Sequence, residues 1–191
     1  MIARSGITLG ILAGGRASRL GGRDKAWLTR GGMPQVVRIA QRFAGECGTV
    51  LVSANAQSER YAAHGFDVVP DRALGIGPLG GIEALAAACA TPWLLTVPVD
   101  LIDINDCLLR SLTAIDAGGA VAEDDDGVQP LIALYRVDAL RCAAAAAIGR
   151  ADYAVQAMQA SLGMPRVRFA GLRFGNLNTP DDLHAAGFGD D

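Results

Sequence analysis

The sequence predicts an α/β fold with a doubly wound, mostly parallel sheet, in a single domain that spans residues 1–191. Short apolar runs alternate with helix-like segments, which is the pattern of parallel strands joined by crossover helices. A glycine-rich basic loop directly follows the first apolar run, and open α/β sheets bind ligands at the carboxyl ends of their strands. The chain has 191 residues, of which 51% are hydrophobic, and this is enough for the core of one domain.

The first half is expected to supply the parallel part of the sheet. Each apolar run is four to nine residues long and ends at a glycine, proline or polar residue, as buried strands do. The predicted strands are residues 6–12, 49–53, 66–69 and 92–100, and the predicted helices are residues 34–47, 57–63 and 82–89. A second glycine cluster, residues 74–81, is expected to open the last of these helices.

The second half is less regular and is expected to add an antiparallel insertion. The predicted helices are residues 104–117, 137–148 and 153–162, and the predicted strands are residues 120–122, 128–135, 166–169 and 172–177. The acidic residues 123–127 between two of these strands are interpreted as a solvent-exposed hairpin turn outside the site. Thr179 is a suitable N-cap for a last helix, with Pro180 at its first position.

Residues 12–25, LAGGRASRLGGRDK, have the composition of a phosphate-binding loop. Gly14, Gly15, Gly21 and Gly22 allow main-chain N–H groups to approach an anion, and Arg16, Arg19, Arg23 and Lys25 supply positive charge. The spacing excludes a P-loop, because Lys25 is followed by Ala26 and not by Ser or Thr. It also lacks the Gly-x-Gly-x-x-Gly order of a dinucleotide fingerprint.

Charge and cysteine content limit the partners. The net charge of −3 argues against a general nucleic-acid binder, so the basic loop should take a small anion. Cys47, Cys89, Cys107 and Cys142 show no CxxC spacing and are interpreted as reduced core thiols, which fits a cytoplasmic protein. The first apolar run is too short to span a bilayer, so no membrane association is expected.

Asp100 is the predicted metal ligand. It stands at the carboxyl end of the most strand-like run, level with the basic loop on another strand. Mg²⁺ usually needs only one or two protein carboxylates when substrate phosphates complete its coordination. A helix cap is the alternative role for this aspartate.

Six segments, taken in order, carry a family resemblance. They are LAGGRASRLGGRDK, VVPDR at 68–72, GPLGGI at 77–82, VPVD at 97–100, QPLIALY at 129–135 and NLNTPDDL at 176–183. In this order they resemble the molybdenum cofactor guanylyltransferases through nearly the whole chain. The resemblance implies a Rossmann-like three-layer αβα nucleotidyltransferase that transfers GMP from GTP to the phosphate of molybdopterin, forming a guanine dinucleotide cofactor and releasing pyrophosphate.

The resemblance also assigns roles to residues. It implies GTP contacts for Leu12, Ala13, Gly14, Gly15, Asp71, Gly77 and Gly81, phosphate contacts for Arg19, Gly22 and Lys25, the magnesium site at Asp100, and pterin-side positions at Asn176 and Asn178. This chain has Ser53 where several members of the family have asparagine, so the base or ribose contact there falls to Ser53 or to Asn55. Residues 1–100 would then mainly hold GTP and residues 101–191 mainly molybdopterin.

The chemistry of this reaction fits the residues available. A phosphate monoester has a second pKa of about 6, so the attacking oxygen is anionic at neutral pH without a protein base. The chain has only His64 and His184, and neither is expected to be catalytic. Lys25, Arg19 and Mg²⁺ on Asp100 are expected to neutralise the departing pyrophosphate. We expect a monomer that contacts cofactor-donating and molybdoenzyme-maturation proteins transiently.

Two other functions stay open from the sequence. The first is a CTP-dependent cytidylyltransferase that acts on the same pterin. Members of that family have a first loop similar to LAAG, where this chain has Leu12-Ala13-Gly14-Gly15. The second is a GTP-binding adaptor that does not transfer the nucleotide. The presence of both Lys25 and Asp100 favours an enzyme.

Overall fold

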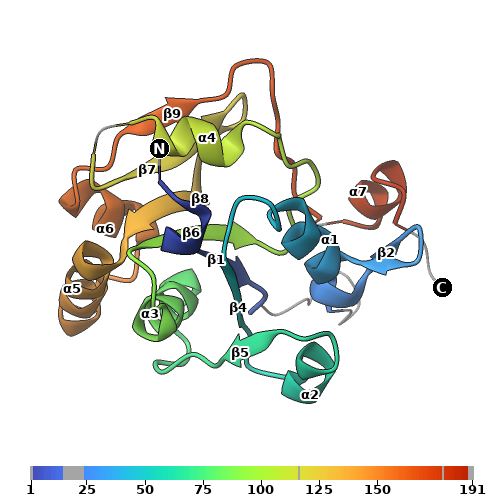
Figure 1. Ribbon diagram of the computed structural model, residues 1–191, viewed down its shortest axis with the longest axis horizontal. Helices are drawn as coiled ribbons and strands as arrows, with labels where there is room; N and C mark the ends of the chain where they lie inside the picture. The colour runs from blue at the N-terminus through green and yellow to red at the C-terminus, as the bar shows by residue number, and fades with distance from the viewer. Residues whose placement is uncertain (1, 15–23, 116, 178, 189–191) are drawn as a thin grey trace.

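A seven-stranded sheet forms the centre of the fold in the computed structural model, which describes residues 2–14, 24–115, 117–177 and 179–188 (Figure 1). The strand order is β5-β4-β1-β6-β8-β7-β9. The strands are β1 (Ile7–Leu12), β4 (Thr49–Ser53), β5 (Asp67–Val69), β6 (Trp93–Pro98), β7 (Gly119–Asp124), β8 (Gly127–Arg136) and β9 (Arg166–Arg168). Only β8 runs antiparallel to its neighbours in this sheet, β6 and β7. The predicted mostly parallel α/β sheet is confirmed.

Helices cover both faces of the sheet, which gives the three αβα layers (Figure 1). On one face α1 (Gln35–Arg42) packs on β1 and α4 (Leu108–Thr113) packs on β7 and β8, in one apolar cluster that α2 (Ser58–Ala62) joins through Tyr61. On the other face lie α3 (Pro78–Ala88), α5 (Val137–Gly149) and α6 (Val155–Ser161). All six residues of β1 are buried, as expected for a strand covered on both sides.

Several predicted elements differ in extent from those observed. The helix predicted over residues 34–47 ends at Arg42, and the one predicted over residues 104–117 is limited to Leu108–Thr113. A short antiparallel pair, β2 (Thr29–Arg30) and β3 (Met33–Pro34), was not predicted. Its turn residues Gly31 and Gly32 both have positive φ, and two such glycines are a hairpin signal that the sequence did contain.

Residues 172–177 do not form the predicted strand. Gly171 and Gly175 have φ of 75° and 66°, which interrupts extended backbone on both sides of Phe174. The segment makes one isolated antiparallel bridge, between Asn176 and Leu101. The final helix α7 (Pro180–Ala185) begins as predicted, because the Thr179 side chain accepts a hydrogen bond from the Asp182 N–H and the Asp182 carboxylate accepts one from the Thr179 N–H.

Two interpretations of polar or reactive residues are wrong in part. Asp124, assigned to an exposed turn, is fully buried at the end of β7. Cys47 and Cys89 are buried thiols as expected, whereas Cys107 is half-buried and Cys142 is exposed on α5. Within the described ranges, no helix is both long and apolar enough to cross a bilayer.

Candidate functional site

The candidate site lies at the carboxyl edge of the four parallel strands β5, β4, β1 and β6. β1 is central there, with β4 on one side and β6 on the other. Two hydrogen bonds continue these ladders beyond the strands: Ala13 N–H donates to the Ser53 carbonyl at 2.9 Å, and Val99 N–H donates to the Leu12 carbonyl at 3.0 Å. The loops that follow all four strands therefore meet at one edge, as in open α/β sheets.

Lys25 and Asp100 form an ion pair at this edge. Lys25 Nζ lies 3.0 Å from Asp100 Oδ2, and the two side chains are 20% and 24% exposed. Lys25 comes from the segment after β1, and Asp100 stands two residues after the end of β6. A cation and a carboxylate are thus held together next to the first strand, and both remain accessible to a bound anion.

The turn that carries Lys25 is anchored from two directions. It is a single 3-10 turn, Lys25–Trp27, capped by Asp24 Oδ1, which accepts from the Ala26 N–H at 3.0 Å. Asp24 Oδ2 accepts a second hydrogen bond, from Gln57 Nε2 at 3.1 Å. The buried Trp27 ring packs 4.7 Å from the ring of Tyr61, under the Arg60 guanidinium at 4.2 Å. Burial of Tyr61 against this turn, followed by the field of Asp24, raises the pKa of its hydroxyl.

A second polar cluster joins Ser53, Asn55 and Asp71. Ser53 Oγ donates to Asp71 Oδ1 at 3.2 Å, and Asn55 Nδ2 donates to Asp71 Oδ2 at 2.9 Å. The Asp71 N–H donates back to Asn55 Oδ1 at 2.9 Å. Ser53 is buried and Asn55 is exposed. The cluster therefore presents an amide and a carboxylate at the surface, and the buried Ser53 holds the carboxylate in place. Such groups can hydrogen-bond the polar edge of a base or a ribose hydroxyl.

Helix α3 packs very closely on this cluster through its glycines. A Cβ on Gly81 would lie 2.6 Å from Ser53 Oγ and 3.0 Å from Leu12 Cδ2, so only glycine fits there. Gly77 has φ of 68° and ψ of −155°, which is essentially restricted to glycine, and it precedes Pro78 at the first position of the helix. The helix predicted from Ile82 therefore begins four residues earlier, and its glycines lie against the Ser53–Asn55–Asp71 cluster.

The segment after Asp100 is fixed by the C-terminal part of the chain. Leu177 N–H donates to the Asp100 carbonyl at 2.9 Å, and Asn176 pairs with Leu101. Asn176 is exposed. Its bridge to Leu101 holds it next to the residue that follows Asp100. This arrangement brings the predicted pterin-side position next to the predicted metal ligand.

The structure thus brings most of the predicted site residues to one edge, in two clusters. Leu12, Ala13 and Gly14 lie between the clusters, and a Cβ on Gly14 would be 3.9 Å from Asn55 Nδ2. Gly15, Arg19, Gly22 and Asn178 lie outside the described residues. His64 and His184, which were not expected to act, are exposed on the surface, and the His64 ring lies tilted beside the Trp27 ring, 5.0 Å between centroids.

The carboxylates at the site fit a metal that arrives with its substrate. Among the side chains that the structure describes, no group of three or more His, Cys, Asp and Glu is arranged to hold a metal ion. Asp100 offers one accessible carboxylate beside Lys25 and the carboxyl end of β1. This donor set suits Mg²⁺, which takes one or two carboxylates and completes its octahedral coordination with substrate phosphates and water.

Some supporting residues were missed by the sequence analysis. Asp24 is the N-cap of the turn that carries Lys25, and an aspartate directly before a short helical turn is a signal that the sequence did contain. Gln35 gave no signal: its buried side chain donates to the Leu101 carbonyl at 2.6 Å, across 66 residues of sequence. The buried amide therefore supports the segment that follows Asp100 from the side of α1.

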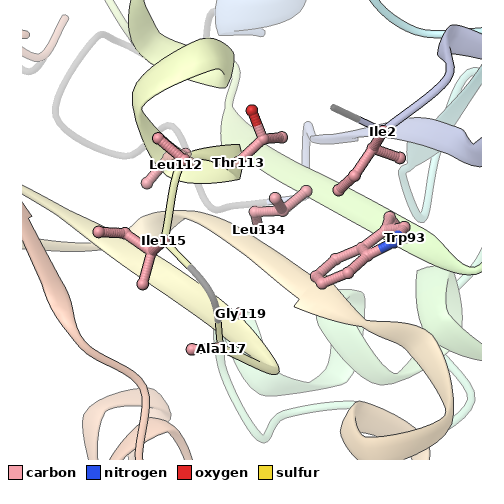
Figure 2. Close-up of a pocket in the computed structure, with 9 residues that line it drawn as sticks. Ile2, Trp93, Leu112, Thr113, Ile115, Ala117, Gly119 and Leu134 are labelled. Carbon is pink, nitrogen blue, oxygen red and sulfur yellow. The ribbon is translucent and has the colours of Figure 1, made fainter.

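A cavity of about 210 Å³ lies at the amino end of β6, opposite to the carboxyl edge that carries the candidate site. Figure 2 shows Leu112 and Ile115 on one side of it and Ile2 and Trp93 on the other, with Leu134 between them. Trp93 begins β6, so the cavity is at the amino end of that strand, away from Asp100. It is separate from the candidate site.

Comparison with known proteins agrees with this geometry. Residues 9–163 match the family described as the MobA-like NTP transferase domain. A molybdenum cofactor guanylyltransferase of Cupriavidus necator is 37% identical over 197 residues, covering 96% of this chain and 97% of the relative. One from Yersinia pseudotuberculosis is 34% identical over 181 residues, covering 92% of each chain.

Solved structures share the fold at lower identity. A molybdopterin-guanine dinucleotide biosynthesis protein A from Archaeoglobus fulgidus superposes with a TM-score of 0.73 at 20% identity, covering 94% of this chain and 96% of that one. A 2-C-methyl-D-erythritol 4-phosphate cytidylyltransferase from Thermus thermophilus gives 0.72 at 19% identity, covering 93% and 96%. With the sequence match running from before the end of β1 to beyond α6, the chain belongs to the MobA-like nucleotidyltransferase family, among the molybdenum cofactor guanylyltransferases.

Proposed function

We propose that the protein transfers GMP from GTP to the phosphate of molybdopterin, forming a guanine dinucleotide cofactor and releasing pyrophosphate. The observation that carries this proposal is the pairing of Lys25 with Asp100 at the end of β1 and β6, one strand away from the Ser53–Asn55–Asp71 cluster. A charged pair for phosphates and a polar cluster for the nucleoside are the two parts that a nucleotidyl transfer site needs. The relatives that cover nearly the whole chain carry the corresponding name.

The two substrates divide the domain between them in this proposal. Residues 1–100 mainly hold GTP, with Leu12, Ala13, Gly14 and Gly15 at the nucleotide and Arg19, Gly22 and Lys25 on its phosphates. Residues 101–191 mainly hold molybdopterin, with Asn176 and Asn178 on its side. The position of Asn176 supports this division, because Asn176 pairs with Leu101, the residue that follows Asp100. We further propose a cytoplasmic monomer that meets cofactor-donating proteins transiently.

The transfer needs positioning more than proton chemistry. The molybdopterin phosphate is already anionic at neutral pH, so its oxygen attacks the α-phosphorus of GTP in line while the bond to the β-phosphate oxygen breaks. Lys25 donates to the phosphate oxygens and stabilises the negative charge that collects on the departing pyrophosphate. Arg19 supplies a second positive charge that stabilises the pyrophosphate. Asn55 and Asp71 hold the nucleoside so that the α-phosphorus meets the acceptor.

Asp100 is the residue that would hold Mg²⁺ in this proposal. The ion supplies charge neutralisation on the phosphates when it is bound. Replacement of Asp100 by asparagine should raise the Mg²⁺ concentration needed for half-maximal rate by at least about tenfold, because the only carboxylate proposed as a ligand is lost. Asp106→Asn, which removes an exposed carboxylate on the same side of the domain, is the control. An unchanged magnesium titration in Asp100→Asn would exclude the metal role.

Pyrophosphate release is the direct test of the function. Molybdopterin is added to the protein with Mg²⁺ and either GTP or CTP, and pyrophosphate is measured along with the dinucleotide product. We expect release with GTP and little with CTP. Preference for CTP would make the protein a cytidylyltransferase, and GTP binding without release would make it a nucleotide-binding adaptor.

A further inference from the structure

Asp124 is a buried carboxylate that the proposed reaction does not use. It ends β7 and has no exposed surface. Asp124 Oδ1 accepts from Asp126 N–H and from Gln129 Nε2, both at 3.0 Å, and Oδ2 accepts from Phe174 N–H at 2.9 Å. A buried carboxylate is tolerated only where donors replace its lost hydration, and each of its two oxygens has at least one donor here.

These hydrogen bonds keep the carboxylate ionised. Burial by itself raises the pKa of Asp124, but the hydrogen bonds from the Phe174 N–H, Gln129 and the N–H groups of Asp126 and Gly127 outweigh it and hold this pKa below its ordinary value. Around it, Arg168 donates to the Asp124 carbonyl and pairs with Glu123 and Asp125 at the surface. Asp124 is therefore a fixed, charged acceptor.

Through Phe174 this acceptor reaches the candidate site. The Phe174 carbonyl accepts from the N–H groups of Ile102 and Asp103 at 3.2 and 3.0 Å, and its ring is buried against Phe169 at 5.4 Å between centroids. Two and three residues later, Asn176 pairs with Leu101 and the Leu177 N–H bonds the Asp100 carbonyl. One strip of backbone, residues 174–177, is thus fixed by Asp124 at one end and lies along residues 100–103.

We propose that Asp124 is a positioning residue for the transfer reaction, one that sets Asn176 and the backbone of Asp100 in register through the strip 174–177. This inference rests on the proposed function, because it assigns the strip to the acceptor side of the reaction. The nucleoside cluster Ser53–Asn55–Asp71 belongs to other strands and does not depend on the strip. Asp124 therefore supports use of the acceptor and not binding of GTP.

Asp124→Asn is the informative variant. An amide keeps the shape but presents an NH₂ group to one of the donors, so a buried N–H loses its acceptor. We expect the KM for molybdopterin to rise by about tenfold while the Kd for GTP changes by less than about twofold. Asp126→Asn, which removes the same charge from a half-exposed neighbour in the turn, should leave both constants unchanged.

Amide hydrogen exchange gives a readout that does not require turnover. In Asp124→Asn the amides of Phe174, Ile102 and Asp103 should exchange at least about tenfold faster, while those of β1 and β4 keep their protection. Gln129→Leu removes one donor only and serves if Asp124→Asn does not fold, with the same direction expected at Phe174. Equal loss of GTP and molybdopterin affinity, or exchange that rises equally throughout the sheet, would overturn the proposal. Exchange and GTP binding still report if the wild-type protein releases no pyrophosphate, so the two proposals can fail separately.

Discussion

Lys25 and Asp100 neutralise one another until a ligand arrives. Their 3.0 Å contact joins positions 75 residues apart, one from the segment after β1 and one after β6. A bound nucleotide brings negative charge that attracts Lys25, and it brings the accompanying cation that suits Asp100. In the proposed reaction the pair is therefore preorganised, with Lys25 contacting the triphosphate and Asp100 the metal ion once the nucleotide binds.

Replacement of Lys25 by alanine should lower the rate of transfer by more than about 10²-fold, because the charge on the leaving pyrophosphate then lacks its stabilising cation. Single-turnover rates with saturating GTP measure this step. Arg30→Ala, which removes an exposed positive charge from β2, should transfer at nearly the wild-type rate. Turnover of the Lys25→Ala protein close to that of this control would remove Lys25 from the mechanism.

Gly81 is the point where α3 is closest to the nucleoside cluster. Alanine there would place a methyl group 2.6 Å from Ser53 Oγ, so the side chain or the helix must shift and the contact of Ser53 with Asp71 is disturbed. We expect a loss of about 1–3 kcal/mol in the free energy of unfolding, together with weaker GTP binding. Urea unfolding and calorimetry measure the two effects. Gly45→Ala, where no atom lies within 4 Å of the new methyl group, should change neither; if Gly81→Ala matched it, the close packing would be refuted.

The sequence indicates which residues stand at strand ends, but it does not indicate which of these residues lie next to each other. Asp100 was located because a long apolar run ends there, and Asp71 and Asn55 follow shorter runs in the same way. Which of these ends meet depends on the strand order β5-β4-β1-β6, which no local pattern encodes. Asp124 was assigned to solvent because its neighbours are acidic, and its burial follows from Phe174 and Gln129, the first of them 50 residues away.

Helix α7 depends on its first turn. It has six residues, and Thr179 and Asp182 satisfy each other's N–H groups in a capping box. Thr179→Ala should therefore lower the free energy of unfolding by about 1 kcal/mol. Chemical denaturation measures it. Thr113→Ala, at the last residue of α4 and half-buried, removes a hydrogen bond to the Arg110 carbonyl and should cost clearly less, and equal losses in the two variants would argue that the box contributes nothing.

Helices and strands were predictable where the composition and the length of a segment indicated the same element. Their first and last residues were not predictable. The alanine-rich α5 was expected over residues 137–148 and ends at Gly149. Gly80 and Gly81 in α3 obscured the start of this helix, because glycine is a poor helix former, but the close approach of the Ala73 carbonyl to Gly80 and of Ser53 to Gly81 requires it there. Residues 172–177 look like a strand by hydrophobicity, but their hydrogen bonds go to Asp124 and to residues 102–103 in place of a ladder.

The acid stability of the entire domain should depend on Asp124. Its pKa is lowered in the folded state, so its contribution is complete above the ordinary aspartate value of 3.8 and is lost as pH falls through the folded-state value. Asp124→Asn should therefore be clearly less stable than the wild type at pH 7, and the gap should narrow at about pH 3 and below. Urea unfolding at both pH values measures this gap. A gap of constant size, or an equal pH dependence in Asp126→Asn, would contradict the assignment.

The hydrogen bond from the Leu177 N–H to the Asp100 carbonyl affects the order in which the site forms during synthesis of the chain. A ribosome delivers the parallel strands β1, β4, β5 and β6 first, since synthesis runs from the amino end. The nascent chain can then assemble the surroundings of Lys25 while residues 100–103 still lack their neighbour. Only when residues 174–177 emerge does the Asp100 carbonyl acquire its hydrogen bond from the Leu177 N–H, so a chain that ends before residue 174 would lack this support of the proposed metal ligand.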